Sequence, residues 1–530
     1  MSGSAAGAPF GRRGFLALAA QGAFAAGSAL AVGSALTGCG GCPQPGSTAT
    51  AVPTLAPVPD VPLQPGGPYT IKDLLSTKSF YIAHRGSGDN WPEHTMRAYS
   101  ESVALGLKAI EVSVWASSDG VLLCHHDAST LRTSGQDFQI PATPYAALAQ
   151  LKVDARAWLG PATPLEPMPR LRDVLDAFAR SHVIFLEDKG GTNADAIIAM
   201  LQDYPDSREH IVWKQPAMSP GHIYARQRGY TTWGYFTGKE LDRAAEFQDR
   251  LDLLGVPTLA PEAPIRQLVA MGKPVIAWEV HRRWERGRLQ RLGVRGMMCS
   301  NVPYVLQRLA PMATDSLGEG SRAAGDLPWK ADSDWAEQPA FVDDALRFGS
   351  APGSYTVGSM APLAAPGWRL DVELRWPEGA ASGGRRAGIA FALGDDSPVA
   401  PAPDGGGQAA SQGGYRLDIA ADGSLALGRT DKGQGQPAPL ASAAGGGAGE
   451  GQWFQVRVEM APVGIRVSAS VDGGRGWSAQ SNDTAFHGGY FALLAGAGPG
   501  GNGSGGDDGS PVEFRNLAVT ALSAQEMCIA

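Results

Sequence analysis

The chain has 530 residues, of which 43% are hydrophobic, a length that exceeds a single hydrophobic core and predicts two or more domains. Its formal net charge at pH 7 is -8, from 44 Lys and Arg residues against 52 Asp and Glu residues. A weakly acidic chain presents no basic field to a polyanion, so nucleic acid is excluded as a partner.

Residues 1–39 are predicted to be a targeting segment. Arg12 and Arg13 precede an uncharged run rich in Ala, Gly and Leu, which ends in Leu36-Thr37-Gly38-Cys39. This order resembles a twin-arginine lipoprotein signal peptide, with Cys39 as the lipidated residue. A transmembrane anchor is the alternative, but the run 14–38 is weakly apolar for a stable span. The resemblance implies an extracytoplasmic protein, lipid-anchored to the cell membrane of a bacterium.

The next segment, residues 40–75, is predicted to be a tether. It is rich in Pro, Ala and Thr, and Asp60 is the single charge before Gly67, so it cannot bury a core. With Cys39 and Cys42 outside the folded parts, three cysteines remain, and they define no disulfide framework.

Residues 76–312 alternate between short β-rich runs and helical stretches, which is typical of an α/β fold with a parallel sheet closed by helices. Eight candidate strands are present, the number that a (β/α)₈ TIM barrel requires. They are 80–84, 109–114, 183–187, 211–214, 231–236, 251–254, 275–278 and 296–299.

A ninth apolar run, residues 121–124, follows the second candidate strand after four residues only. Four residues cannot form a parallel crossover, so we expect a hairpin with Asp119-Gly120 in its turn. The hairpin returns His126 towards the strand that carries Glu111. Both residues, with His84 and Glu187, are thereby predicted at the C-terminal face, where TIM-barrel enzymes keep their active sites.

Polar motifs follow these strands in a specific order. They are His84-Arg85-Gly86, Pro92-Glu93-His94-Thr95, Glu111-Val112-Ser113, His126-Asp127 and Glu187-Asp188-Lys189. Together they resemble the glycerophosphodiester phosphodiesterase family over about residues 76–312. Near the end of the barrel, Cys299-Ser300-Asn301 also follows the family pattern, with Asn301 in place of a common aspartate.

The resemblance implies that His84 and His126 are the acid/base pair of a phosphoric diester hydrolase. Two imidazoles can perform the two proton transfers, because one removes a proton from the attacking oxygen while the other protonates the leaving alcohol. Arg85 and Lys189 are expected to bind the substrate phosphate. Without the resemblance, a histidine at a strand end is more often structural, and Glu187 with Lys189 is equally an ion pair.

Glu111 and Glu187 are the predicted ligands of one divalent cation, Ca²⁺ or Mg²⁺. The family carries Glu-x-Asp as two ligands, whereas this chain has Glu111 followed by Ser113, so one carboxylate is missing. A neutral hydroxyl lowers the metal affinity, unless water, Glu93 or Asp127 fills the position. His94 likewise stands where the family commonly has asparagine.

The character of the sequence changes after the barrel. Residues 313–340 are a predicted linker, 341–522 a β-sandwich and 523–530 a tail. Period-two alternation in runs such as 368–376, 454–460 and 465–471, separated by Gly, Asp and Ser, predicts an antiparallel sandwich. Its closing strands resemble those of concanavalin-like jelly-roll domains, which implies contact with a glycan.

The sequence indicates two alternative functions. The first is an extracytoplasmic phosphodiesterase that hydrolyses glycerophosphodiesters or a related envelope phosphodiester by metal-assisted, two-histidine acid/base catalysis. The nucleophile is either water or a hydroxyl group of the substrate. The second is a barrel impaired through Ser113, which binds a phosphorylated glycan of the envelope. Glycan hydrolysis by the sandwich lacks a recognisable carboxylate pair.

Overall fold

The computed structural model describes residues 66–306, 313–322 and most of 329–528. Within the last range it leaves out residues 331–338, 349–352, 358–364, 378–385, 398, 400–411, 435–436, 447–450, 472–473, 475 and 496–510. The predicted signal peptide and Cys39 lie outside the described residues, so lipidation stays a prediction. None of the helices that the structure describes is long and apolar enough to cross a membrane.

The predicted eight-stranded parallel barrel is confirmed. Its first strand, β1, pairs with β2 on one side and with β11 on the other, which closes the sheet. The strands are β1 (Phe80–Ala83), β2 (Ala109–Ala116), β6 (Val183–Asp188), β7 (Ile211–Pro216), β8 (Thr231–Tyr235), β9 (Leu253–Pro257), β10 (Val275–Val280) and β11 (Gly296–Cys299).

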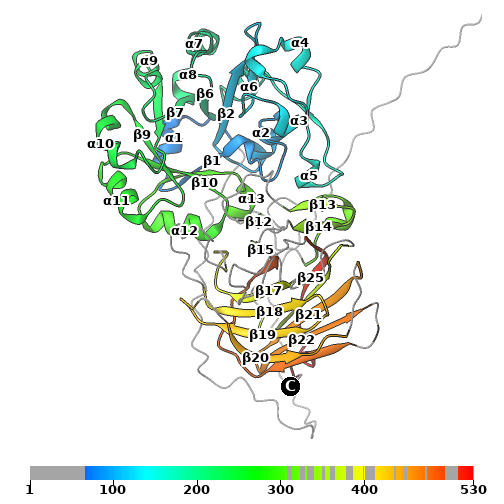
Figure 1. The fold of residues 1–530 in the computed structure, drawn as a ribbon. Helices are drawn as coiled ribbons and strands as arrows, with labels where there is room; N and C mark the ends of the chain where they lie inside the picture. Colours follow the sequence, from blue (N-terminus) through cyan, green and yellow to red (C-terminus); the bar gives the residue numbers. More distant parts are fainter. Residues whose placement is uncertain are drawn as a thin grey trace, which may run out of the picture. The chain divides into compact units, whose positions relative to one another are not determined.

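Helices lie outside the barrel strands (Figure 1). Helix α6 buries an apolar stripe in the core cluster that it shares with the sheet, formed by Leu171, Val174, Leu175 and Phe178. The helices are α1 (Ile71–Ser76), α2 (Met96–Ala104), α3 (Leu131–Ser134), α4 (Tyr145–Leu148), α5 (Arg156–Leu159), α6 (Leu171–Phe178), α7 (Ala194–Leu201), α8 (Ser207–His210), α9 (Gly221–Gln227), α10 (Ala244–Phe247), α11 (Glu262–Ala270), α12 (Arg283–Arg291) and α13 (Val302–Val305).

Side-chain alternation along the strands separates the barrel interior from its outer layer. Phe185 packs with one buried cluster, which also contains Trp233 and Met298, whereas Ile184 and Leu186 belong to the cluster shared with the helices. The interior set continues towards the strand ends as polar residues, because Glu187 follows Phe185 by two positions. The same spacing leads from Val212 to Lys214 on β7.

The predicted tether boundary at residue 75 is wrong, because α1 crosses it. Ile71 and Leu74 are buried in the cluster that fills the barrel interior. Thr70 caps the helix and exchanges hydrogen bonds with Asp73 in a capping box, which fixes where the helix begins. The ordered barrel therefore starts before residue 76.

The predicted hairpin above the barrel is also present. β3 (Leu122–Cys124) runs antiparallel to β2, with Val114 opposite Cys124. Gly120 has a φ of 81°, a backbone conformation that favours glycine in the tight turn. A further small sheet pairs β4 (Lys152–Val153) with β5 (Glu166–Pro167).

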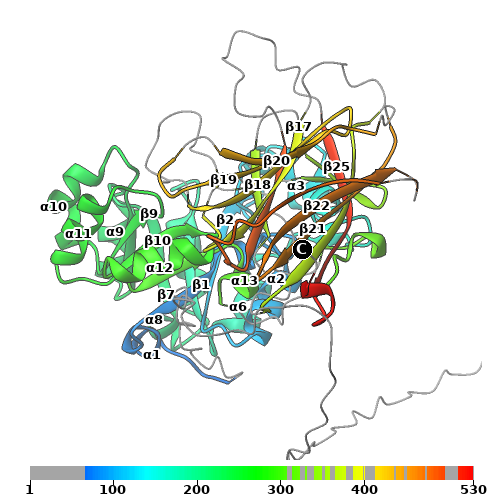
Figure 2. The ribbon, with the colours of Figure 1, turned by 90° about the horizontal axis from the view of Figure 1, so that it is seen from below.

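The C-terminal region consists of two antiparallel seven-stranded sheets around a common core. Figure 2 shows β17, β18, β19 and β20 of one sheet beside β21, β22 and β25 of the other. The first sheet contains β12 (Trp329–Lys330), β15 (Gly353–Val357), β24 (Tyr490–Ala495), β17 (Arg386–Leu393), β18 (Gly414–Ala420), β19 (Leu425–Thr430) and β20 (Ala438–Ala443). The second contains β13 (Ala340–Val342), β14 (Ala345–Phe348), β25 (Val512–Ala521), β16 (Trp368–Arg375), β21 (Phe454–Ala461), β22 (Gly464–Val471) and β23 (Trp477–Ser481).

The predicted linker contributes to the sandwich. Leu317 is buried in the sandwich core, and Asp315 accepts a hydrogen bond from the backbone N–H of Leu517 at 2.6 Å. Strand β12 pairs with β15, and β13 begins at Ala340. Residues 313–319 and 329–330 thus contribute to the sandwich, because Thr314 forms a β-bridge with Ala518, Leu317 is buried in the core and β12 pairs with β15.

We predict that Leu74→Ala destabilises the barrel by about 2–5 kcal/mol, because it removes a buried side chain from the barrel interior. The free energy of unfolding, measured by denaturant titration, tests this value. Lys72→Ala, at an exposed position of the same helix, is the control and leaves the midpoint nearly unchanged. Equal midpoints for the two variants would assign α1 to the tether.

Candidate active site

His84 and Arg85 lie directly after β1, in the short 3-10 turn His84–Gly86. Arg85 adopts a positive φ of 52°, which turns its backbone N–H towards β2, where it donates to Glu111 Oε2 at 2.8 Å. Gly86 also has a positive φ, and a Cβ there would lie 2.7 Å from Cβ of Ala98. The His-Arg-Gly motif therefore needs glycine for close packing against α2.

His126 is held by the carboxylate that follows it in the chain. Its Nδ1 lies 2.7 Å from Asp127 Oδ1, and its Nε2 lies 3.1 Å from Nζ of Lys189. Asp127 therefore fixes the ring orientation and leaves Nε2 facing the lysine. Burial lowers the pKa of His126 below its ordinary value, although the hydrogen bond to Asp127 opposes the shift. The ring is thus neutral near pH 7 and able to accept a proton.

His84 is oriented from the opposite side of the barrel. Its Nδ1 lies 2.8 Å from Oγ of Ser300 and 3.3 Å from Oε2 of Glu279. Behind Glu279, the Nδ1 of His281 lies 2.7 Å from Asp89 Oδ2. Glu279 lies in β10 and Ser300 follows β11, and the sequence patterns gave neither residue a role.

A second set of contacts, which we call the arginine–carboxylate chain, connects Arg85 to His126 through Glu93, Arg132 and Asp127. Arg85 donates to Glu93 at 3.1 Å, and Arg132 donates to both Glu93 oxygens at 2.9 and 2.6 Å. Arg132 Nε also donates to Asp127 Oδ2 at 2.7 Å. The Arg132 guanidinium thereby connects Arg85, the predicted phosphate-binding arginine, to His126 of the predicted acid/base pair.

The arginine–carboxylate chain holds Glu93 and Asp127, the two residues that could have replaced the missing carboxylate at position 113. Glu93 is buried, and although burial alone raises the pKa of its carboxyl, the guanidinium groups of Arg85 and Arg132 hold it well below the usual range. Asp127 also has a lowered pKa, since His126 and Arg132 overcome the effect of its partial burial. Both carboxylates are engaged by cations and do not extend the set around Ser113.

Glu111, Ser113, Glu187 and Lys214 form a group that we call the barrel-mouth ion cluster. Nζ of Lys214 donates to Glu111 Oε1 at 2.7 Å and to Glu187 Oε2 at 2.5 Å. Oγ of Ser113 donates to Glu111 Oε1 at 2.9 Å. All four side chains are buried, with an exposed fraction of 6% for Lys214 and less for the others.

The remaining carboxylate oxygens of this cluster are also occupied. Glu111 Oε2 accepts the backbone N–H of Arg85, and Glu187 Oε1 accepts the hydroxyl of Tyr235 at 2.7 Å. Lys189 lies 3.5 Å from Glu187. Every carboxylate oxygen therefore already has a hydrogen-bond donor within its own domain.

These residues do not fit a divalent cation as they stand. Ca²⁺ and Mg²⁺ need several oxygen ligands, and the space between the two glutamates holds an ammonium group. Among the residues that the structure describes, no three His, Cys, Asp or Glu side chains are arranged to hold a metal ion. The predicted ligands Glu111 and Glu187 do converge, but on Lys214.

Charge pairing dominates the titration of this cluster. Burial alone lowers the pKa of Lys214, but the carboxylates of Glu111 and Glu187 raise it above its ordinary value. Burial raises the pKa of each glutamate, and the Lys214 charge brings both below the ordinary value. Lys214 is therefore an ammonium and both glutamates are carboxylates at neutral pH.

The structure brings the predicted site residues together at the C-terminal end of the barrel. His84 and Arg85 follow β1, His126 follows β3 and Lys189 follows β6, whereas Glu111 and Ser113 lie within β2 and Glu187 lies within β6. Lys214, Arg132 and Glu279 were missed. Lys214 had a signal, since it follows the inward-facing Val212 by two positions at the end of a predicted strand. Arg132, on the short helix α3, had none.

Two other residues singled out from the family pattern make structural contacts. Asn301 Oδ1 accepts a hydrogen bond from the amide of Asn90 at 2.9 Å. His94 is buried, its Nδ1 lies 2.7 Å from the hydroxyl of Tyr99, and burial holds the pKa of the ring well below the usual range. Both positions therefore support loops beside the site.

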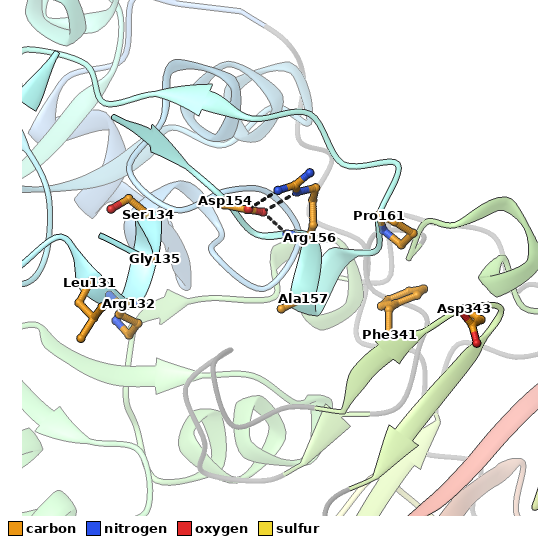
Figure 3. Close-up of a pocket in the computed structure, with 10 residues that line it drawn as sticks. All are labelled: Leu131, Arg132, Ser134, Gly135, Asp154, Arg156, Ala157, Pro161, Phe341 and Asp343. Carbon is orange, nitrogen blue, oxygen red and sulfur yellow. Dashed lines mark hydrogen bonds and ion pairs between the residues drawn. The ribbon is translucent and has the colours of Figure 1, made fainter. Parts of the chain in front are cut away.

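A surface pocket opens beside α3 and α5 (Figure 3). Its lining includes Arg132 of the arginine–carboxylate chain and the ion pair of Asp154 and Arg156, in which Nη2 and Oδ2 are 2.6 Å apart. Neither His84 nor His126 lines this pocket. The predicted acid/base pair therefore lies outside this pocket.

Comparisons with known proteins agree with this chemistry. Residues 84–215 match the model of the Glycerophosphoryl diester phosphodiesterase family. Over 241 residues the chain is 23% identical to the "Putative glycerophosphodiester phosphodiesterase YhdW" of Bacillus subtilis (strain 168), which covers 43% of this chain and 97% of that protein. Over 60 residues it is 42% identical to Glycerophosphodiester phosphodiesterase GDPD6 of Arabidopsis thaliana. This alignment covers 11% of this chain and 16% of that protein.

A solved structure of an Oleispira antarctica phosphodiesterase, in complex with the product sn-glycerol-3-phosphate, is 18% identical, with a TM-score of 0.38, and covers 43% of this chain and 95% of that one. The family match and the relatives make residues 84–215 similar to the Glycerophosphoryl diester phosphodiesterase family.

We predict that Arg132→Ala destabilises the protein by about 3 kcal/mol, because it removes a partly buried cation and leaves the buried Glu93 with one fewer partner. Chemical denaturation measures this change. Arg156→Ala breaks the exposed pair with Asp154 nearby and serves as the matched control, with little effect. Equal losses in the two variants would contradict a structural role for the arginine–carboxylate chain.

Proposed function

We propose that this protein is an extracytoplasmic, lipid-anchored phosphodiesterase that hydrolyses glycerophosphodiesters or a related phosphodiester of the cell envelope. One observation carries the proposal. His84 and His126 each have Nδ1 engaged by a carboxylate, and they lie at strand ends beside Arg85 and Lys189. The family match over residues 84–215 supports the substrate class.

In the proposed reaction, His126 is the base. Its lowered pKa leaves the imidazole neutral, so Nε2 accepts the proton of the attacking hydroxyl as the new P–O bond forms. His84 is the acid, and it gives a proton to the alcohol oxygen as the bond from phosphorus to that oxygen breaks. His126 gains one proton and His84 loses one, so the protons of the step balance.

The phosphate is bound by cations. Arg85 presents a planar guanidinium held by Glu93, and Lys189 lies beside Nε2 of His126. These two side chains draw the phosphoryl oxygens to the position between the histidines and stabilise the negative charge that develops on them.

The reaction has two possible courses, which differ in the nucleophile that attacks phosphorus. Water gives the phosphomonoester directly, whereas a neighbouring hydroxyl of the substrate gives a cyclic phosphodiester first. Both variants use the same two histidines, and ³¹P NMR of the products distinguishes them.

The sandwich is proposed to contact a glycan. Its support is the resemblance to concanavalin-like jelly-roll domains and a polar groove on the second sheet. Asp371, Glu373 and Gln455 line this groove, with Arg457 beside them. Side chains of this kind hydrogen-bond sugar hydroxyls.

Ser113 favours a second candidate function, in which the barrel binds a phosphorylated envelope glycan without cleaving it. Such a protein uses Arg85 and Lys189 and needs no acid/base pair. Turnover by the purified protein separates the two functions.

We expect His126→Ala and His84→Ala each to lower kcat/KM for a glycerophosphodiester by roughly 10²–10⁴-fold, the usual contribution of acid/base catalysis. Release of the alcohol, measured with protein that lacks residues 1–39, tests this. His487→Ala, an exposed histidine of the sandwich, is the control and retains full activity. An inactive wild type that still binds the diester would establish the binding protein.

We also expect the acidic limb of the kcat/KM profile to lie below pH 6.5, because His126 has a lowered pKa and must be neutral to act as a base. Asp127→Asn removes the hydrogen bond that raises this pKa, so the limb moves to still lower pH while the maximal rate falls. A limb that stays in place in Asp127→Asn would assign it to another group.

A further inference from the structure

We propose that the ammonium of Lys214 takes the place of a divalent metal ion in this barrel, so that phosphodiester cleavage here proceeds without Ca²⁺ or Mg²⁺. The inference rests on the proposed function and concerns the cation that its site uses. It replaces the expectation that Glu111 and Glu187 hold a metal.

The first support is the position of Nζ of Lys214. It lies 2.7 Å from Glu111 and 2.5 Å from Glu187, between the two side chains that were predicted to hold the cation. These residues come from β2, β6 and β7, which are neighbours in the barrel, and Glu187 stands opposite Lys214 in the pairing of β6 with β7. The lysine reaches this point from a regular strand.

The second support is how closely the side chain is confined. Nζ of Lys214 lies 5.6 Å from the ring centroid of Tyr235 and 5.9 Å from that of Trp233. The rings come from β8, on the side of β7 away from the glutamates. A metal ion that replaced Nζ would push the lysine towards these rings, where its charge would lose both carboxylates.

The third support is the role of Ser113. The Ser113 hydroxyl carries no negative charge to attract a cation, and it donates its hydrogen to Glu111 Oε1 at 2.9 Å. It therefore orients Glu111 towards Lys214. An aspartate at this position would instead add a third negative charge beside the two glutamates.

The formal charge of the barrel-mouth ion cluster equals that of a metal site with three carboxylates. Two carboxylates and one ammonium leave a formal charge of -1 on the barrel-mouth ion cluster. Three carboxylates with one divalent cation, the arrangement that a Glu-x-Asp motif implies, also leave -1. The change from aspartate to Ser113 and the presence of Lys214 together account for the two positive charges of a metal ion.

In this arrangement Lys214 is a positioning residue. It neutralises Glu111 and Glu187, which otherwise repel a phosphodiester anion near Arg85 and Lys189. It also fixes Glu111, whose Oε2 accepts the backbone N–H of Arg85. The phosphate-binding turn after β1 therefore keeps its geometry without a metal ion.

The test starts from the protein without residues 1–39, treated with a chelator. We expect kcat/KM for a glycerophosphodiester to change by less than twofold on addition of Ca²⁺ or Mg²⁺. Calorimetric titration with either ion, or with Mn²⁺, is expected to show no saturable binding at the barrel, and the melting temperature stays constant. Activity that is lost with the chelator and restored by a metal, with saturable binding, overturns the proposal.

Two variants sharpen the test. Ser113→Asp combined with Lys214→Ser supplies three carboxylates and removes the ammonium, so we expect saturable Mn²⁺ binding and metal-dependent turnover. Lys152→Ser, an exposed lysine of the barrel, is the matched control and behaves like the wild type. Lys214→Arg keeps the charge and is expected to bind no metal. Metal binding by the wild type equal to that of the double variant contradicts the proposal even if the double variant is inactive.

The two proposals fail separately. A wild type that binds no metal and cleaves no glycerophosphodiester under any condition refutes the phosphodiesterase, while the binding data still identify Lys214 as the resident cation. A wild type that cleaves only with metal refutes the role of Lys214 and keeps the phosphodiesterase.

Discussion

The contact on which the site depends is the buried pairing of one ammonium with two carboxylates at the mouth of the barrel. Glu111, Glu187 and Lys214 lie where the strand ends bury them, and each alone would carry a large desolvation cost. Their short hydrogen bonds therefore constrain three neighbouring strands at once. Because Glu111 also accepts the N–H of Arg85, this constraint extends to the turn that carries His84.

His84 and His126 are held by different partners, which suits their different proposed roles as acid and base. His126 belongs to the arginine–carboxylate chain, in which Arg132 connects Asp127 to Glu93 and Glu93 to Arg85. His84 instead contacts Glu279 and Ser300. A displacement of Arg132 would thus disturb both Arg85 and His126, whereas His84 has separate contacts. Networks of this kind couple residues far apart in the sequence through a few charged contacts.

The strands of the barrel could be predicted because their side chains alternate between two environments. The eight runs from residue 80 to 299 were recognisable, and so was the hairpin at Gly120, where four residues exclude a crossover. The domain ends were harder. Ile71 lies in a segment of tether-like composition, and Leu317 in a segment that reads as a linker, yet both are buried in a core. Composition does not reveal that a short segment finds an apolar surface elsewhere in the chain.

The sequence by itself determined the barrel and its histidines, because strand periodicity and the spacing of the motifs are local properties of the chain. It also marked Ser113 as the departure from the expected ligand set. Only the tertiary structure decided what compensates for it. Lys214 is 101 residues from Ser113 along the chain, and it reaches Glu111 because β7 and β2 both flank β6. The position of Lys214 between Glu111 and Glu187 follows from that pairing of strands, which no local pattern in the sequence encodes.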